Sequence, residues 1–311
     1  MDLPLDDGLR VGFITGFGSR DAGRALAETA RRLHFDSIWV GDHVAFPLPI
    51  LDPLIQLAQL AAYTDDLELG TSVFLLPLRH PVLVAKQVAS LDQLCEGRFL
   101  FGVGIGGEFP AEYAACGVPR EERGARLSES IPLVQSLLRG EATRGGRFYP
   151  FPETKLAPAA RRFGGPPIWC GGRAPAALAR AGRCGDGWIS YVVTPERFRQ
   201  GLEQIAKSAE AANRRLERFG TSHLLFTRID DDADAALAAA AAHLSQRYAM
   251  DFREPARRYA ALGRPADVAE RIEAFRAAGV RHLILDMVGP GPDRDEQLER
   301  FSREVRPLLS H

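Results

Sequence analysis

Residues 67–107 begin with the apolar run Leu67-Glu-Leu-Gly-Thr71 and end beyond a second run, Arg98-Phe-Leu-Phe-Gly-Val103. A helical pattern with apolar residues on one face separates the two runs over residues 81–94. Each run leads into a polar or glycine-rich loop. Such loops at the carboxyl ends of successive strands carry the ligand sites of α/β barrels. This stretch therefore predicts an α/β fold with a ligand site at that end of the sheet.

Strand-like runs alternate with helical patterns along the whole chain, which predicts parallel strands covered by helices. The expected strands are 10–15, 36–41, 67–71, 98–103, 167–170, 187–190, 222–228 and 282–286. The expected helices are 21–33, 53–63, 81–94, 122–138, 174–181, 195–219, 233–248, 265–278 and 293–309. Eight such units in 311 residues predict one (β/α)8 TIM barrel domain over 1–311, with insertions near 104–121, 139–165 and 229–264. A doubly wound sheet is the structural alternative.

The composition excludes several classes of function. With 39 basic and 40 acidic residues the net charge is −1, which argues against binding to nucleic acid or an anionic membrane. No apolar run reaches the length of a membrane span, and no secretion signal opens the sequence. The four cysteines lack metal-ligand spacing, so we expect no metal site and reduced thiols in a cytoplasmic protein.

Two loops carry candidate catalytic residues. Asp42 and His43 follow the second expected strand, and a histidine there could exchange a proton with a substrate near neutral pH. The alternative is a buried histidine that only hydrogen-bonds the next loop. Glu108 follows the fourth strand as a carboxylate at the rim, unless it is simply a solvated loop acid. We interpret all three residues as candidates for catalysis.

Glycines before Glu108 form the sequence Gly102-Val-Gly104-Ile-Gly106-Gly107, which matches the dinucleotide-binding pattern G-x-G-x-x-G. In that pattern the last glycine lies inside an opening helix, whereas Phe109-Pro110 is expected to interrupt a helix here. We favour another interpretation, in which Gly104 and Gly106 let a flat ligand approach the backbone closely. A bulge at Ser72-Val73, after the third strand, would bring the chain toward the same ring.

A second glycine-rich loop, Cys170-Gly171-Gly172-Arg173-Ala-Pro175, joins the fifth strand to a helix. Glycine N–H groups at a helix start, with an arginine beside them, predict a phosphate site. Ser190-Tyr191 ends the next strand and could supply hydroxyl groups to the same anion. The alternative is a tight turn that needs glycine for its geometry. For Arg79-His80 we leave open a second anion contact or a helix-start cap.

Together these segments resemble the luciferase-like monooxygenase family, and within it the branch that uses the deazaflavin coenzyme F420. The resemblance covers most of the chain and is weak in 139–165 and 229–264. The residues that carry it include Phe35-Asp-Ser-Ile-Trp-Val-Gly-Asp-His43, Leu69-Gly-Thr-Ser-Val73, His80-Pro81, Leu91-Asp-Gln-Leu94, Phe101-Gly-Val-Gly104, Pro167-Ile-Trp-Cys-Gly-Gly172 and Gly185-Asp-Gly-Trp-Ile189.

The resemblance implies a barrel with a flavin or deazaflavin ring in its mouth. It places the phosphate near Gly171, Gly172, Arg173 and Ser190, and the ring face against Ser72 and Val73, which deazaflavin members often join by a cis bond. It places Asp42, His43 and Glu108 near the ring or the substrate. No tryptophan follows His43, unlike the sugar-phosphate dehydrogenases, so a sugar phosphate is not the expected substrate. The cofactor-binding candidates are Ser72, Val73, Gly104, Gly106, Cys170, Gly171, Gly172, Arg173 and Ser190.

The expected function is hydride transfer between coenzyme F420 and a small organic substrate. The alternative is a monooxygenase that uses oxygen and reduced FMN from a separate flavin reductase. A barrel that binds flavin without catalysis is a third reading, which the acid and histidine around the expected ring disfavour. A lyase or isomerase would need a lysine at a strand end, and Lys86, Lys155 and Lys207 are not so placed. Apolar residues on outer helices indicate a homodimer.

Overall fold

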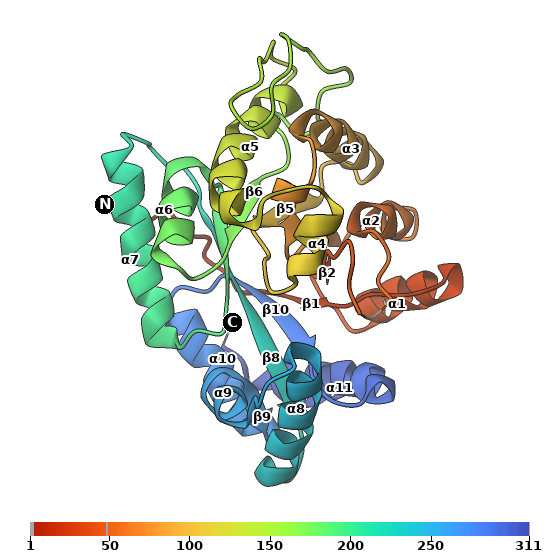
Figure 1. Ribbon diagram of the computed structural model, residues 1–311. Coiled ribbons are helices and arrows are strands. Elements are labelled where there is room, and N and C mark those ends of the chain that lie inside the picture. The colour runs from red at the N-terminus through yellow and green to blue at the C-terminus, as the bar shows by residue number, and fades with distance from the viewer. Residues whose placement is uncertain (1–2, 48, 311) are drawn as a thin grey trace.

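The computed structural model describes residues 3–47 and 49–310. Within them, eight parallel strands close into a barrel, because β10 pairs with both β1 and β8 (Figure 1). The barrel strands are β1 (Arg10–Ile14), β2 (Ser37–Val40), β3 (Glu68–Thr71), β5 (Phe99–Gly104), β6 (Ile168–Gly171), β7 (Gly187–Tyr191), β8 (Gly220–Ile229) and β10 (His282–Met287). The predicted (β/α)8 TIM barrel is therefore confirmed and the doubly wound alternative was wrong.

Helices surround the barrel as the alternating pattern predicted, and several begin at a proline in the first turn. They are α1 (Arg20–Arg32), α2 (Pro53–Ala61), α3 (Pro81–Leu94), α5 (Arg123–Leu138), α6 (Pro175–Cys184), α7 (Pro195–Ala211), α10 (Pro265–Ala277) and α11 (Arg294–Arg300). The predicted helix 195–219 was too long. Asn213 has φ of +52°, a left-handed conformation that follows the helix end at Ala211.

Further elements follow β3, β5 and β8, and those after β5 and β8 fall in segments expected to be insertions. After β3 come β4 (Phe74–Leu75) and a 3-10 turn; α4 (Pro110–Ala115) follows β5, and α8 (Ala233–Tyr248), α9 (Arg253–Tyr259) and β9 (Ala261–Gly263) follow β8. As predicted, Gly107 does not lie inside a helix: its φ is +112°, and α4 begins only at Pro110. In residues 139–165, three backbone N–H groups of Arg147, Phe148 and Tyr149 donate to the Glu129 carboxylate.

Large side chains fill the inside of the barrel: Trp39, Leu100, Trp169, Ile189 and Ile284. Ile14, Val73 and Leu224 pack against this layer but remain partly exposed. Apolar side chains inside a small barrel are normally covered by neighbours. The mouth of the barrel therefore has an apolar floor that is open at the end where ligands bind in this fold.

Among the described residues, no helix combines the length and the apolarity needed to cross a membrane.

Candidate active site

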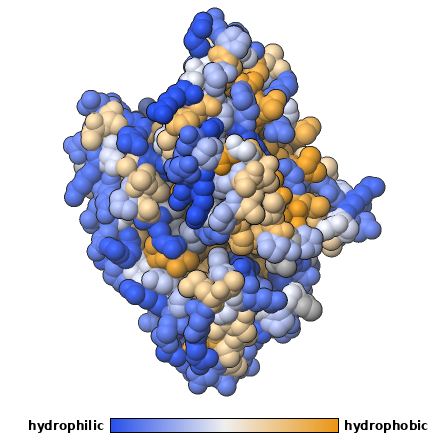
Figure 2. Space-filling model, viewed as in Figure 1, coloured by the Kyte–Doolittle hydropathy of each residue, from blue (hydrophilic) through white to orange (hydrophobic). Residues whose placement is uncertain are grey.

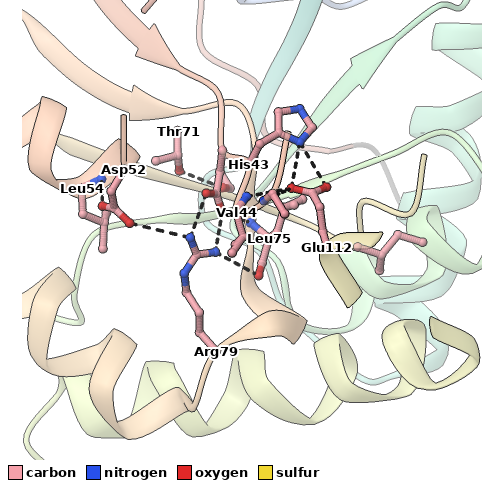
Figure 3. A network of polar contacts seen from close by, with 12 residues as sticks. His43, Val44, Asp52, Leu54, Thr71, Leu75, Arg79 and Glu112 are labelled. Atoms are coloured by element: carbon pink, nitrogen blue, oxygen red, sulfur yellow. Dashed lines mark hydrogen bonds and ion pairs between the residues drawn. The ribbon is translucent and has the colours of Figure 1, made fainter. Parts of the chain in front are cut away.

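Asp42 lies after β2 and is tied to its neighbours through both carboxylate oxygens. Arg79 Nη1 donates to Oδ2 at 2.6 Å, Arg79 Nη2 donates to Oδ1 at 2.9 Å, and the Leu75 N–H donates to Oδ2 at 2.7 Å (Figure 3). Burial raises the pKa of the Asp42 carboxyl, and Arg79 and the Leu75 N–H act against this shift. These contacts give Asp42 the position of an anchor that holds the chain before His43, rather than of a group facing a ligand.

His43 pairs with a carboxylate from another loop. Its Nδ1 lies 3.2 Å from both Oε1 and Oε2 of Glu112, a residue of α4 (Figure 3). Glu112 is buried, and its Oε1 also accepts the backbone N–H of Val44 at 2.7 Å. The other ring nitrogen of His43 points away from Glu112 in Figure 3. The ring is therefore oriented by one edge and presents the opposite edge.

Aromatic rings form one wall beside His43. Phe46 stacks on the imidazole with 3.9 Å between ring centroids, and Phe109 meets both rings edge-on. Both phenylalanines come from loops at the carboxyl ends of strands. Glu112 thus fixes the direction in which Nδ1 points, and stacking on Phe46 fixes the plane of the His43 ring.

The structure places Ser72 and Val73 directly after β3, and the peptide bond between them is cis. Val73 lies against two of the predicted cofactor-binding glycines. A methyl group at Gly104 would come within 2.3 Å of Val73 Cγ2, and one at Gly171 within 2.7 Å of Val73 Cγ1. The space at these glycines is therefore occupied by Val73, where the sequence argument expected a ligand.

Gly106 is explained in the same way. It has φ of +55°, and a methyl group there would lie 2.8 Å from Leu75 Cδ2. Glycine at this position thus accommodates a positive φ and the side chain of Leu75. The expectation of close contact with a flat ligand at Gly104 and Gly106 stays a prediction, and the contacts in the structure are made by the chain itself.

The loop after β6 differs in detail from the predicted phosphate cradle. The Gly172 N–H donates to the Ile189 carbonyl at 3.1 Å, so it is not free for an anion. The Cys170 side chain is buried and faces Gly185 at the end of α6, and burial raises the pKa of its thiol. The Cys170 thiol is therefore enclosed by the protein and the Gly172 N–H is bound within it, which does not fit the cofactor contacts predicted for these two residues.

Ser190 corrects the sequence argument most clearly. Its hydroxyl is buried and lies 2.7 Å from His223 Nδ1, and the His223 ring stacks on Phe275 of α10. Ser190 therefore points outward to the helix layer and cannot supply a hydroxyl to the mouth. Its neighbour Tyr191 points the other way and donates from its hydroxyl to Glu108 Oε1 at 3.1 Å.

Arg173 retains the arrangement expected of an anion site. Its side chain is exposed, and the guanidinium carbon lies 4.7 Å from the Tyr191 ring centroid. The adjacent helix α6 begins without a side-chain cap, and its first turn leaves the Ala176 N–H available, because Pro175 has no N–H and the Ala177 N–H donates to the Ala174 carbonyl at 2.8 Å. An uncapped helix start beside an arginine fits a phosphate. The residues present are therefore compatible with the phosphate of a flavin or deazaflavin.

Glu108 is exposed at the rim of the barrel mouth, beside Tyr191. It accepts a hydrogen bond from the Tyr191 hydroxyl, and burial of the phenol, with the Glu108 charge as a smaller cause, raises the pKa of Tyr191. The structure thus brings Glu108 together with Arg173 through the Tyr191 side chain. Asp42 and His43 form the other part of the site, where Asp42 is bound to Arg79 and His43 to Glu112.

Glu112 had no predicted role, and Arg79 and Tyr191 make other contacts than those proposed from the sequence. His80, left open between an anion contact and a cap, caps α3 by accepting the Val82 N–H at Nδ1. Arg79, left open in the same way, does neither and pairs with the Asp42 carboxylate. Glu112 lies four residues after Glu108, so a helix starting at Pro110 was the only available signal that the second acid could turn inward.

Comparison with known proteins places this geometry among enzymes. The family model described as luciferase-like monooxygenase matches residues 14–282. The F420-dependent glucose-6-phosphate dehydrogenase of Nakamurella multipartita is 29% identical over 91% of this chain and 91% of its own. The oxygenase component of the flavin-dependent trigonelline monooxygenase of Acinetobacter baylyi is 27% identical over 92% of this chain and 88% of its own.

Among solved structures, an F420-dependent secondary alcohol dehydrogenase bound to an F420–acetone adduct superposes with a TM-score of 0.85. It covers 98% of this chain and 100% of its own at 18% identity, so the likeness shows the shared fold alone.

Proposed function

This chain belongs to the luciferase-like monooxygenase family, and we propose that it transfers a hydride between coenzyme F420 and a small organic substrate. The family includes both F420-dependent oxidoreductases and flavin-dependent monooxygenases, so the choice of cofactor is part of the proposal. The similarity to an F420-dependent dehydrogenase over nine-tenths of both chains supports the deazaflavin.

The observation that best supports hydride transfer is the pairing of His43 with Glu112. Moving a hydride to or from a carbon that bears oxygen requires a proton to move at that oxygen, and a positioned histidine can donate or accept it. The Nδ1 edge of His43 is held by Glu112 at 3.2 Å, and the opposite edge is left for the substrate. We assign to His43 the exchange of that proton.

The cofactor, when bound, would supply the hydride acceptor or donor carbon of its ring. The exposed Arg173 and the uncapped start of α6 would hold its phosphate, with Gly171 at the adjacent strand end. Ser72 and Val73 would lie against the ring, above the apolar floor of the barrel. Glu108 would border the ring through its contact with Tyr191.

The substrate would occupy the side of the mouth that carries His43. Phe46 and Phe109 line this side, while Arg79 and Asp42 neutralise each other behind it. A wall of aromatic rings with one proton-exchanging nitrogen suits a small apolar molecule with a single hydroxyl or carbonyl group. This reading agrees with the expectation that a sugar phosphate is not the substrate.

A second candidate is a two-component monooxygenase that takes reduced FMN from a separate reductase. The 27% identity to a flavin-dependent oxygenase component over 92% of this chain favours it. It would use the same barrel mouth and the same phosphate anchor at Arg173.

Titration of the purified protein with each oxidised cofactor, followed by fluorescence, separates the two candidates. The proposal expects micromolar affinity for F420 and markedly weaker binding of FMN. Arg173→Met should weaken F420 binding by about ten- to a hundredfold, because a hydrogen bond to a charged group contributes about 1.5–3 kcal/mol. Tight FMN binding with none of F420 would favour the monooxygenase instead.

The catalytic assignment needs a separate test with F420 as the redox partner. His43→Ala should lower turnover about 10²–10⁴-fold, the usual contribution of a general acid or base, while leaving F420 affinity nearly unchanged. Unchanged turnover would remove His43 from the mechanism.

We also propose that the protein forms a homodimer through the face that carries α2 and α3. Figure 2 shows apolar side chains gathered on that side of the molecule. Ile55 of α2 and Leu83 of α3 are each 66% exposed, and Leu94 is 64% exposed. Large exposed apolar residues that cluster on neighbouring helices mark interaction surfaces. Sedimentation equilibrium should show a dimer for the parent protein and a monomer for I55K/L83K; a monomeric parent protein would overturn the proposal.

A further inference from the structure

We propose that Glu112 is a positioning residue that sets the tautomer of His43, keeping the proton on Nδ1 and leaving Nε2 bare to accept a proton from the substrate. The inference rests on the proposed role of His43 and concerns a residue to which the sequence argument gave no role. It comes from the hydrogen bonds around one buried carboxylate, drawn in Figure 3.

The backbone fixes the Glu112 carboxylate before His43 is considered. Oε1 accepts the Val44 N–H at 2.7 Å and lies 3.4 Å from the Ala45 nitrogen. The side chain is 1% exposed, so water does not compete for these contacts. Two consecutive N–H groups aimed at one oxygen require that oxygen to be an acceptor.

The same carboxylate then decides where the imidazole proton lies. Nδ1 of His43 is 3.2 Å from Oε1 and from Oε2. A carboxylate offers only acceptor sites, so a neutral imidazole beside it must present its N–H. Nδ1 therefore carries the proton, and Nε2 carries the lone pair. Phe46, stacked at 3.9 Å, opposes the rotation about Cβ–Cγ that would put Cδ2 in the place of Nδ1.

Glutamine at position 112 should reverse this arrangement. Its amide has one acceptor and one donor end. The Val44 N–H requires the acceptor end at the place of Oε1, so the NH2 group takes the place of Oε2 and points at Nδ1. A protonated Nδ1 would then face this NH2 group at the same 3.2 Å as the retained oxygen, so we expect the tautomer with a bare Nδ1 and a protonated Nε2 to be favoured. A nearly isosteric change would thus convert His43 from a proton acceptor to a proton donor.

The test is ¹⁵N NMR of ring-labelled histidines in the full-length protein without cofactor at alkaline pH, where neutral imidazoles are observed. His43 is assigned by comparison with His43→Ala. The proposal expects protonated Nδ1 in the parent protein and in Glu112→Asp, and protonated Nε2 in Glu112→Gln. Glu121→Gln, an exposed acid on the same segment, serves as the matched control and should keep the parent pattern.

The readout needs neither cofactor nor substrate, so it stands apart from the identity of the reaction. Protonated Nε2 in the parent protein, or an unchanged pattern in Glu112→Gln, would overturn the positioning role. If the tautomer reverses as expected, turnover with F420 should fall about 10²–10⁴-fold in Glu112→Gln while F420 affinity stays within threefold. A reversed tautomer with full turnover would keep the positioning of His43 and refute its catalytic role. Circular dichroism confirms that each variant is folded, and Glu112→Asp, which keeps the carboxylate, should restore most of the turnover.

Discussion

Replacing Arg79 with methionine removes the charge that faces a buried carboxylate, while a long apolar side chain remains. The Asp42 side chain is fully buried, and the Arg79 side chain is 20% exposed. Removing one partner of a buried ion pair typically costs about 3–5 kcal/mol, because the other charge is left uncompensated. We expect about 3 kcal/mol for Arg79→Met, the lower end, since the Leu75 N–H still donates to Asp42.

Asp42→Asn in the same background tests the reason for this loss. The asparagine oxygen still accepts the Leu75 N–H, but no buried charge remains. The double variant should therefore be more stable than Arg79→Met by about 2 kcal/mol, with a net loss of about 1 kcal/mol for the missing hydrogen bonds. Arg264→Met removes an exposed partner of Asp267 and should cost less than about 1 kcal/mol.

Urea unfolding measures these differences. With an m-value of about 3 kcal/mol/M, Arg79→Met should lower the midpoint by about 1 M. The pH dependence has a definite sign. Burial raises the pKa of Asp42 in the folded protein above its value in the unfolded chain, so folding disfavours the charged form. Stability is therefore lost as the pH rises from the unfolded pKa to the folded pKa.

Loss of Arg79 raises the Asp42 pKa further, so the deficit of Arg79→Met should be small near the ordinary carboxyl pKa of about 3.9 and grow toward pH 8. A double variant no more stable than Arg79→Met, or a deficit independent of pH, would refute the reasoning. Either result would mean that the Asp42 charge is not held by Arg79.

Three further outcomes follow from contacts in the site. Gly104→Ala should destabilise the protein by about 1–3 kcal/mol in thermal unfolding, because its methyl group would meet Val73 at 2.3 Å. Ser190→Ala should leave F420 affinity unchanged within twofold in the fluorescence titration, because the hydroxyl faces the helix layer. A thiol reagent at pH 8 should label Cys116 well before Cys170, since burial raises the pKa of both thiols but encloses only Cys170 completely.

Each of these outcomes has a contrary result and a control. Gly18→Ala has no atom within 4 Å of the added methyl and should be near neutral; equal losses at both glycines would contradict the steric argument. A tenfold loss of F420 affinity in Ser190→Ala would show that Ser190 reaches the cofactor after all. Equal labelling rates for the two cysteines would contradict the burial of Cys170.

The barrel could be predicted from sequence because its strands are short apolar runs separated by helices that start at proline. The direction of a side chain on such a strand could not. Both faces of a parallel barrel strand are buried, one by the interior and one by the helices, so hydropathy does not distinguish them. Ser190 and Tyr191 are adjacent on β7 and point to opposite sides, and the sequence argument chose the wrong one for the mouth.

The acid that orients His43 was missed for a related reason. Glu108 and Glu112 both follow β5, and nothing in the sequence says which of them reaches a histidine 69 residues away. The short helix α4, opened by Pro110, turns Glu112 inward and leaves Glu108 at the rim. Close approach of a flat ligand at Gly104 and Gly106 stays a prediction. The approaching groups in the structure are Val73 and Leu75.

A crystal structure of the protein grown with saturating F420 tests the central proposal most directly. We expect the phosphate within hydrogen-bonding distance of Arg173 and the first turn of α6, with the ring over Val73 and its reactive face toward His43. A phosphate bound at the opposite rim, or a mouth that excludes F420 and takes up FMN under the same conditions, would contradict deazaflavin-dependent hydride transfer.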